Sequence, residues 1–424
     1  MMIFNVENYT AFKQQLLAWA NQTGSCAFLD SHHYNDAYNK YNCIVGCGIV
    51  DSIQAQAGNA LEQLKTWLNQ NAGKWIFGHL GYGLKNETEQ ILTSNPDFNN
   101  FPDLFFFVPE SIIKLNNQSV EITTQNNIDP KSVFNAILHT EIQTETLSKA
   151  NLIPRVSKAD YLEAIHVIKQ HILRGDCYEL NYCQEYYAEN YHANPTDIFL
   201  TLQRRSPTPF GCFYKVEHNY LLCASPERYV QKTGNTIISQ PIKGTEPRIH
   251  DSEELDTQRI ASLKNSAKNQ AENVMVVDLV RNDFSKICEE GSVHVPELFG
   301  IYSFPQVHQM ISTVKGTIDP ELTIADVAKA TFPMGSMTGA PKKRVLEIID
   351  ALEPTARNIY SGTVGYISPD NDFDFNVVIR SIIYNTKTCY LSYFVGGGIT
   401  WNSVAEEEYE ECLHKAAAIV DILT

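Results

Sequence analysis

A single lysine stands at the end of a strand-like run in the stretch IISQPIKGTEPR, residues 237–248. The β-branched residues before it predict a strand, and the glycine and threonine after it predict a turn. A lysine at a strand end ordinarily points into water. A lysine held in an apolar site, by contrast, gives up its proton more easily and becomes a nucleophile. Lys243 is therefore the first candidate for covalent chemistry.

Two glutamates and a lysine fall on one face of a predicted helix near the end of the chain. In VAEEEYEECLHKAAAIV, residues 404–420, Glu408, Glu411 and Lys415 stand at positions i, i+3 and i+7. Carboxylates spaced in this way suit a hard cation such as Mg²⁺. On the pattern alone, however, a solvated acidic face is the commoner explanation.

A further carboxylate and a run of glycines stand on other segments. Glu272 lies in the first turn of a predicted, mostly buried helix, where it either complements the helix dipole or supplies another metal ligand. Gly396, Gly397 and Gly398 end a predicted strand, so that backbone N–H groups there can approach an anion closely. Triple glycine also marks simple bulges, and the signal is weak by itself.

Composition makes nucleic acid and anionic membranes poor partners. The 424 residues include 33 lysines and arginines against 49 aspartates and glutamates, which gives a formal net charge of −16. An anionic substrate therefore needs local positive charge. Ten scattered cysteines without a CxxC pair indicate a reduced, cytoplasmic protein. We find neither a secretory signal pattern nor an apolar run near the ~18 residues that span a bilayer.

The elements that must position these residues follow no regular βαβ order. Hairpins and runs of strands interspersed with helices predict an α+β fold with large antiparallel sheets. We expect an N-terminal region, residues 1–150, and a catalytic region, residues 151–424, packed together as one unit. The second region opens with an amphipathic helix that ends on Gly175. The segments that bear on the site are expected helices at 251–269, 271–281 and 404–423, and expected strands at 177–187, 236–242, 375–384 and 389–396.

Nine short motifs, in order, make the second region similar to the chorismate-utilising enzymes. This family includes anthranilate synthase component I, aminodeoxychorismate synthase component I, and the isochorismate and salicylate synthases. The resemblance covers about residues 158–421 and implies antiparallel sheets packed as an orthogonal sandwich with helices outside. The motifs are GDCYELN (175–181), SPER (225–228), PIKGT (241–245), AENVMVVDLVRND (271–283), VHQMIS (307–312), GSMTGAPK (335–342), IYSGTVGY (359–366), VIRS (378–381) and EYEECLHKA (408–416).

The lysine of PIKGT separates the members of this family. Sequences similar to aminodeoxychorismate synthase carry this lysine, whereas anthranilate synthases carry a small residue in its place. The resemblance therefore implies that Lys243 attacks C2 of chorismate while the C4 hydroxyl leaves. Ammonia then adds at C4 to give 4-amino-4-deoxychorismate, on the route to 4-aminobenzoate and folate. Anthranilate synthase component I is the main alternative, ahead of an isochorismate or salicylate synthase and of a non-catalytic chorismate-binding subunit.

The resemblance also implies roles for individual residues. Glu227 of SPER matches a general acid, which must stay protonated near neutral pH. Thr245 and His308 match residues that line one face of the substrate ring, although on the sequence alone a structural role is the commoner one for His308. The expected ligands of Mg²⁺ are Glu272, Glu408 and Glu411. The residues expected to bind the rest of the substrate are Ser336, Tyr360, Arg380, Gly396, Gly397, Gly398 and Lys415.

Four positions depart from the residues that are common in the family. Glu179 stands for a glutamine, Glu246 for an arginine, Asn358 for a glycine and Asn402 for an aspartate. A nucleophilic Lys243 needs a lowered pKa, which a dry pocket and a neighbouring Mg²⁺ would provide. Glu246 would raise that pKa if it faced the pocket, and we expect it to face solvent.

The source of ammonia is expected to lie on another chain. The sequence lacks the G-x-C-x-G nucleophile motif of a glutamine amidotransferase. The resemblance therefore implies a glutamine amidotransferase subunit as partner. Without that partner, we expect the protein to use free ammonium salts at elevated pH.

Overall fold

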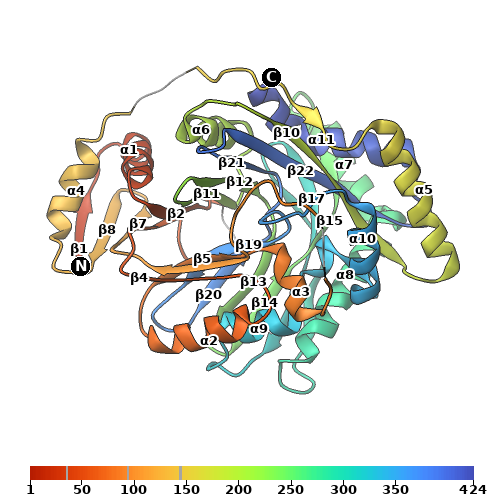
Figure 1. The fold of residues 1–424 in the computed structure, drawn as a ribbon, viewed down its shortest axis with the longest axis horizontal. Coiled ribbons are helices and arrows are strands. Elements are labelled where there is room, and N and C mark those ends of the chain that lie inside the picture. Colours follow the sequence, from red (N-terminus) through yellow and green to blue (C-terminus); the bar gives the residue numbers. More distant parts are fainter. Residues whose placement is uncertain (35–36, 93–94, 143–145) are drawn as a thin grey trace.

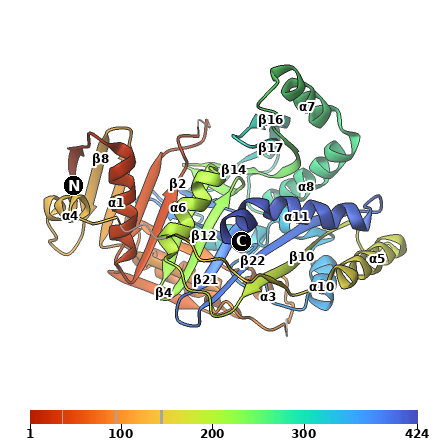
Figure 2. The same ribbon diagram turned by 90° about the horizontal axis from the view of Figure 1, so that it is seen from above.

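Two large antiparallel sheets with helices around them form the architecture (Figures 1 and 2). The computed structural model describes residues 1–34, 37–92, 95–142 and 146–424. Both sheets take strands from the N-terminal and the C-terminal parts of the chain, since β2 (Ser25–Asp30) pairs with β11 (Phe210–Val216) and β5 (Ile76–Leu80) pairs with β19 (Thr363–Ile367). The predicted α+β class with large antiparallel sheets is confirmed.

The larger sheet contains twelve strands among the described residues. In spatial order they are β1 (Met2–Asn5), β8 (Ser119–Thr124), β7 (Ser111–Asn116), β3 (Cys43–Cys47), β2, β11, β12 (Asn219–Ser225), β21 (Ser381–Asn385), β22 (Tyr390–Ile399), β10 (Glu179–Ala188) and β18 (Gly339–Ala340), with β9 (Ile153–Pro154) beside β10.

The smaller sheet contains ten strands within the same described ranges. Their order is β15 (Ile242–Pro247), β17 (Val307–Thr317), β14 (Thr236–Gln240), β13 (Arg228–Thr233), β20 (Phe373–Asn376), β19, β5, β6 (Leu104–Val108) and β4 (Asp51–Ala55), with β16 (His294–Ser303) beside β17.

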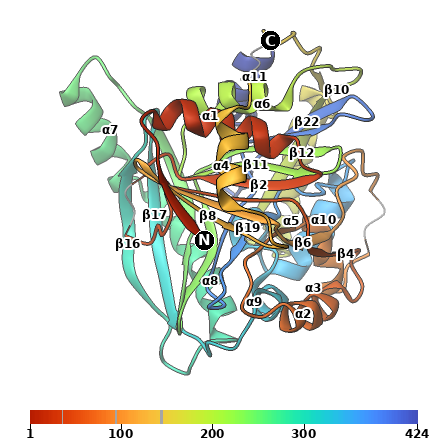
Figure 3. The same ribbon diagram turned by 90° about the vertical axis from the view of Figure 1, so that its left-hand side faces the viewer.

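Helices cover the outer faces of both sheets. They are α1 (Tyr9–Asn21), α2 (Ala60–Gln70), α3 (Lys85–Thr88), α4 (Pro130–Leu138), α5 (Lys158–Arg174), α6 (Pro195–Arg205), α7 (Glu253–Asn265), α8 (Ala267–Ser285), α9 (Ile324–Thr331), α10 (Lys342–Leu352) and α11 (Ala405–Leu423). In Figure 3, α7 lies beside β16 and β17 at one edge of the molecule. No helix in the described ranges is long and apolar enough to cross a membrane.

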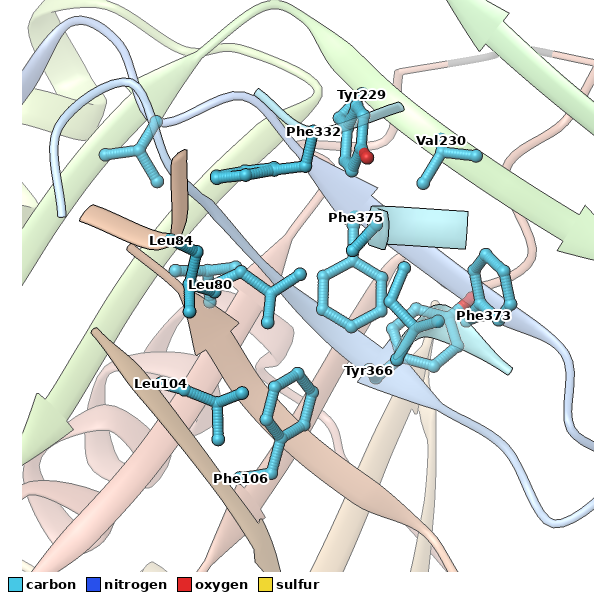
Figure 4. Packing of buried hydrophobic residues seen from close by; sticks show 14 of the residues in the cluster. Leu80, Leu84, Leu104, Phe106, Tyr229, Val230, Phe332, Tyr366, Phe373 and Phe375 are labelled. Atoms are coloured by element: carbon cyan, nitrogen blue, oxygen red, sulfur yellow. The ribbon is translucent and has the colours of Figure 1, made fainter. Parts of the chain in front are cut away.

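The larger sheet is buried on both faces, which explains its unbroken apolar runs. In β2, Ala27 belongs to the cluster between the two sheets, whereas the next residue, Phe28, belongs to the cluster under the helices. Figure 4 shows part of the same cluster around the smaller sheet, whose face away from the larger sheet carries Phe106 and Phe375 with ring centroids 6.1 Å apart. The two sheets therefore share one apolar layer, and polar groups inside it need specific partners.

Several expected elements are wrong in their bounds. The strand expected at 236–242 is divided between β14 and β15, and two further differences have a clear local cause. The expected helix at 251–269 is two helices, because Ser266 ends α7 and accepts a hydrogen bond from the N–H of Asn269 as the N-cap of α8. The expected strand at 375–384 is broken, because the chain passes from β20 in the smaller sheet to β21 in the larger one. By contrast, the helix expected to end on Gly175 does so, with Gly175 at φ +84°.

A buried ion pair ties together three segments that carry candidate site residues. Arg357 and Glu353 are 2% and 5% exposed, and two of their nitrogen–oxygen distances are 2.8 and 2.6 Å. The guanidinium also donates to the carbonyl of Asn181 in β10 and to that of Met337, each at 2.8 Å. The pair thus joins β10, the segment around Met337 and the connection that follows α10.

Replacing Arg357 with methionine is expected to lower the free energy of unfolding by about 3–5 kcal/mol. The change leaves Glu353 as an uncompensated buried carboxylate. Urea unfolding would measure the loss. The surface pair Arg344–Glu347, at 2.9 Å, provides the control, and Arg344→Met should cost less than about 1 kcal/mol. Equal losses in the two variants would contradict the structural role given to Arg357.

Candidate active site

Two candidate site residues lie where the chain crosses from one sheet to the other. Glu227 lies between β12 of the larger sheet and β13 of the smaller one, and Arg380 lies between β20 and β21. The crossings are joined by backbone hydrogen bonds, from the N–H of Val377 to the carbonyl of Glu227 at 3.0 Å and from the N–H of Ala224 to the carbonyl of Arg380 at 3.2 Å. Arg380 turns the chain with φ +51°.

Glu227 is a buried carboxyl whose pKa lies near neutrality. Burial raises the pKa of Glu227 to about 7, against the opposing effects of a hydrogen bond from Ser336 and the charge of Lys243. Arg380 also acts on this carboxyl, and its own pKa is lowered by burial. A carboxyl in this state can hold a proton at neutral pH and release it to a bound group.

Lys243 reaches from the smaller sheet to the larger one. Its ammonium contacts the Oε1 atom of Glu179, the first residue of β10, and its side chain is only 11% exposed. Gly398 of β22 lies opposite the lysine. A Cβ added to this glycine would lie 2.6 Å from the Lys243 Nζ atom and closer still to Glu179. The missing side chain at Gly398 therefore makes room for the lysine head group.

A bulge in β15 shapes this approach. Ile242 pairs with Ile311 and Thr245 pairs with Gln309, so two residues of β15 stand opposite one residue of β17. Gly244, which follows the lysine, has φ +89°, a conformation that favours glycine. The glycine of PIKGT thus allows the backbone conformation that the chain adopts directly after Lys243.

Carboxylates hold Lys243 in its charged form. Burial acts to lower the pKa of Lys243, but the carboxylates of Glu179 and Glu272 outweigh it and raise the pKa above the ordinary value. The expected burial of the lysine is found, and the expected fall of its pKa is not. Glu246 is not responsible, because it pairs with Arg259 at 3.1 Å.

Acidic side chains from α8 and α11 come together next to this pair. The Nζ atom of Lys268 lies 4.0 Å from Glu272 and 3.7 Å from Glu408, while Glu411 pairs with Lys415 at 2.8 Å. Burial raises the pKa of Glu272, against the opposing charge of Lys243. The charge of Lys415 lowers the pKa of Glu411.

Two buried carboxylate oxygens at this end have no hydrogen-bond partner among the described residues, Oε2 of Glu179 and Oε1 of Glu272. Such atoms suit a cation or a ligand donor. In the part of the chain that the structure describes, no three His, Cys, Asp or Glu side chains stand close enough to enclose a metal ion. Lys268, between Glu272 and Glu408, provides the positive charge there.

The remaining expected substrate-binding residues lie around the same space. Tyr360 is buried, and its ring stacks on Phe394 with centroids 5.1 Å apart. Lys415 donates to the carbonyl of Gly396 at 3.0 Å. An added Cβ on Gly397 would lie 3.2 Å from Glu408 and 3.7 Å from the Lys415 Nζ atom. The glycines of β22 thus allow side chains of α11 to pack close to the strand.

His308 lies on a different face from Thr245, contrary to expectation. It stands opposite Glu246, whereas Thr245 stands opposite Gln309, and opposed residues in a sheet share a face. The ring nitrogens of His308 lie 2.9 Å from Asp256 and 2.8 Å from Ser303. The expectation that Thr245 and His308 line one face of the substrate is therefore wrong, and His308 connects β17 to α7.

Two residues of the site were missed as functional candidates. Glu179 was noted only as a departure from glutamine, and it is the residue that contacts Lys243. Lys268, one helical turn before Glu272, lies between two of the acidic side chains. The i, i+4 spacing of Lys268 and Glu272 was a signal in the sequence, but the approach of Glu408 from α11 was not.

A chorismate binding enzyme family model matches residues 25–421. The chain belongs to the chorismate binding enzyme family. Among curated relatives, aminodeoxychorismate synthase component 1 of Escherichia coli is 33% identical, over 81% of this chain and 75% of that protein. The protein of the same name from Klebsiella aerogenes is 35% identical, over 81% of this chain and 76% of that protein. The chloroplastic aminodeoxychorismate synthase of Arabidopsis thaliana is 34% identical, and the match spans only 39% of its length.

Solved structures of two enzymes share the fold. Anthranilate synthase component I from Streptococcus pneumoniae superimposes with a TM-score of 0.79 at 25% identity, over 92% of this chain and 94% of that one. The menaquinone-specific isochorismate synthase of Escherichia coli also gives 0.79, at 16% identity, over 100% of this chain and 94% of that one. The fold is therefore common to enzymes with different names, and individual residues must separate them.

Substituting Glu179 with glutamine is expected to shift the titration of Lys243 in this chorismate binding enzyme to lower pH. The carboxylate favours the ammonium form, and a neutral amide removes that effect. The rate at which trinitrobenzenesulfonate labels the Lys243 peptide, followed by mass spectrometry across pH, would give the midpoint.

Glu246→Gln is the matched control for this experiment. Its carboxylate pairs with Arg259, so the midpoint of Lys243 labelling should stay where it is in the wild type. An unchanged midpoint in Glu179→Gln, or the same shift in both variants, would show that Glu179 does not set the charge of the lysine.

Proposed function

We propose that the chain is the synthase component that converts chorismate and ammonia to 4-amino-4-deoxychorismate, a precursor of 4-aminobenzoate and folate. The observation that carries the proposal is a buried lysine, Lys243, at the position where the two sheets meet, beside a carboxyl with a pKa of about 7. The names of the relatives from Escherichia coli, Klebsiella aerogenes and Bacillus subtilis support it.

The first half-reaction uses both groups. Lys243 gives its ammonium proton to Glu179, the carboxylate that it contacts. The amine then forms a bond to C2 of chorismate, the two conjugated ring double bonds shift from C1=C2 and C5=C6 to C1=C6 and C4=C5, and the C4–oxygen bond breaks. Glu227 donates its proton to the departing hydroxyl, which leaves as water. Hydroxide is a poor leaving group, and a carboxyl with a pKa near 7 can supply the proton at neutral pH.

The second half-reaction reverses this pattern with a different nucleophile. Ammonia forms a bond to C4, both ring double bonds shift back to C5=C6 and C1=C2, and the bond between C2 and Lys243 breaks. The extra proton on the new amine returns to Glu227. The lysine leaves as a neutral amine and regains its proton from Glu179. The chain thus ends each cycle in its starting state, with the amino group of the product taken from ammonia.

Charge complementarity supports chorismate, a dicarboxylate, as the substrate. Arg380 and Lys415 would bind its carboxylates, together with the hydroxyls of Ser336 and Tyr360 and the backbone N–H groups at Gly396, Gly397 and Gly398. Close contacts of this kind outweigh the repulsion of a chain with a net charge of −16, because distant charges are screened beyond a Debye length of about 8–10 Å.

We propose Mg²⁺ as the cofactor, held by Glu272 and Glu408 with Glu411 nearby. The unpartnered buried oxygen of Glu272 and the hard oxygen donors fit such an ion. When bound, the ion would neutralise a substrate carboxylate. It would also take over the role of Lys268 as counter-charge to Glu272 and Glu408.

A glutamine amidotransferase subunit is the partner that this function requires. The bacterial relatives are named component 1, which implies a second component. We propose that the second component delivers ammonia and that free ammonium salts replace it in vitro. A reducing, cytoplasmic location is consistent with ten free cysteines.

Anthranilate synthase component I is the alternative, favoured by the relative of that name from Saccharolobus solfataricus, 31% identical over 81% of this chain and 79% of that protein. That enzyme class would release pyruvate from the same substrate. Lys243 argues against it, because anthranilate carries its amino group at C2, where a lysine nucleophile would compete with the ammonia that must add there.

Lys243→Ala is expected to reduce the formation of 4-amino-4-deoxychorismate by roughly a thousandfold or more, because a covalent step loses its nucleophile. Liquid chromatography with mass spectrometry would identify products from chorismate, Mg²⁺ and ammonium chloride. Lys232→Ala, at a lysine that donates to the carbonyl of Leu322 at 2.9 Å on the smaller sheet, is the control for substitution of a buried lysine. Anthranilate and pyruvate as the main products of the wild type would overturn the proposal.

Glu272→Gln is expected to weaken the binding of Mg²⁺ by roughly tenfold or more, because one of its proposed charged ligands is lost. Isothermal titration of the protein with Mg²⁺ measures the affinity without relying on turnover. Glu347→Gln, in the surface pair with Arg344, is the control and should bind Mg²⁺ as the wild type does. Equal affinity in Glu272→Gln and the wild type would remove Glu272 from the ligand set.

A further inference from the structure

Neighbouring residues of β17 face opposite sides of the smaller sheet. His308, paired with Asp256, and Ser312, whose hydroxyl lies 2.5 Å from Asn273, face helices α7 and α8. Because side chains alternate along a strand, Gln309 and Ile311 face the other side. Ile311 lines a small cavity together with Pro226, Arg228, Gln240 and Tyr302, next to the crossing that carries Glu227.

Gln309 is therefore the polar residue of VHQMIS on the face that His308 was expected to share with Thr245. It stands directly opposite Thr245, which lies two residues after Lys243 on β15. The distance from Gln309 Nε2 to the Thr245 hydroxyl is 3.5 Å. The side chain is 1% exposed, and its Oε1 atom has no hydrogen-bond partner among the described residues.

An unfilled acceptor in a buried carboxamide destabilises the free protein, and a bound donor would satisfy it. A site built to accept a hydrogen bond discriminates strongly for ligands that provide the donor. Chorismate, the substrate in our proposed function, carries one hydroxyl group, at C4. That hydroxyl is the group that must leave, and Glu227 is the acid that must reach its oxygen.

We propose that the carboxamide of Gln309 accepts a hydrogen bond from the C4 hydroxyl of chorismate. This contact directs the hydroxyl hydrogen toward Gln309 and leaves an oxygen lone pair free for the proton of Glu227. An amide does not itself release a proton, so Gln309 is a substrate-positioning residue and Glu227 remains the acid. The inference rests on the proposed function and adds the residue that orients the leaving group.

Gln309→Met tests this inference, because methionine fills a similar volume without an acceptor of comparable strength. We expect kcat/KM for chorismate to fall roughly tenfold to a hundredfold, from the loss of a hydrogen bond to the reacting group. Gln309→His restores an acceptor nitrogen and should keep more activity than Gln309→Met. Its activity should also fall on the acid side as the imidazole becomes charged, at a pH near its ordinary pKa of about 6.5.

Gln203→Met is the matched control. Gln203, on α6, is another buried glutamine whose Oε1 atom lacks a partner in the described ranges, and its Nε2 atom donates to the carbonyl of Cys223 at 2.8 Å. This variant should change the melting temperature as much as Gln309→Met does, and leave kcat/KM near the wild-type value. Equal kcat/KM in the two methionine variants, or an activity of Gln309→His below that of Gln309→Met, would overturn the inference.

The test separates this inference from the proposed function. The product of the wild type identifies the reaction, whereas the rate at which each variant consumes chorismate reports on Gln309. Should the wild type form anthranilate, the proposed function fails. If Gln309→Met consumes chorismate at the wild-type rate, the role of Gln309 is rejected whatever the product is.

Discussion

The contact between Lys243 and Glu179 joins the two sheets at the point where the chemistry is proposed to occur. Its formation needs β15 to carry a bulge with a glycine after the lysine, and β22 to present a glycine opposite it. It also needs β10 held in place, which the buried pair of Arg357 and Glu353 does through the carbonyl of Asn181. A buried lysine without such a carboxylate would lose much of its charge.

Environment divides the proton-carrying groups of the site into two kinds. Burial at a chain crossing raises the pKa of Glu227 to about 7. The hydrogen bond from Ser336 and the positive charges of Lys243 and Arg380 offset only part of this rise. Lys243, whose side chain is 11% exposed, stays charged because carboxylates lie around it. An acid that keeps its proton and an amine that must lose its own therefore stand side by side. Chorismate and a divalent cation would change the balance between them, since both alter the charge next to Glu272 and Glu179.

Local patterns predicted much of this fold, and long-range contacts account for what they missed. The end of α5 at Gly175 followed from a single residue type. The break at Arg380 did not, because residues 375–384 read as one apolar strand and only the pairing partners reveal the change of sheet. Asn358 has φ +53°, which explains how an asparagine stands in the place of a glycine. The faces of β17 depend on its register with β15, so the sequence could not choose between His308 and Gln309.

The central claim is that Lys243 bonds covalently to the substrate, and peptide mass spectrometry of the protein quenched during the reaction tests it most directly. With chorismate and Mg²⁺ but no ammonia, the account predicts that the peptide containing Lys243 gains the mass of chorismate less one water. Addition of ammonia should remove that gain as product appears. Product formation at the full rate, with the Lys243 peptide unmodified at every time point, would contradict the account.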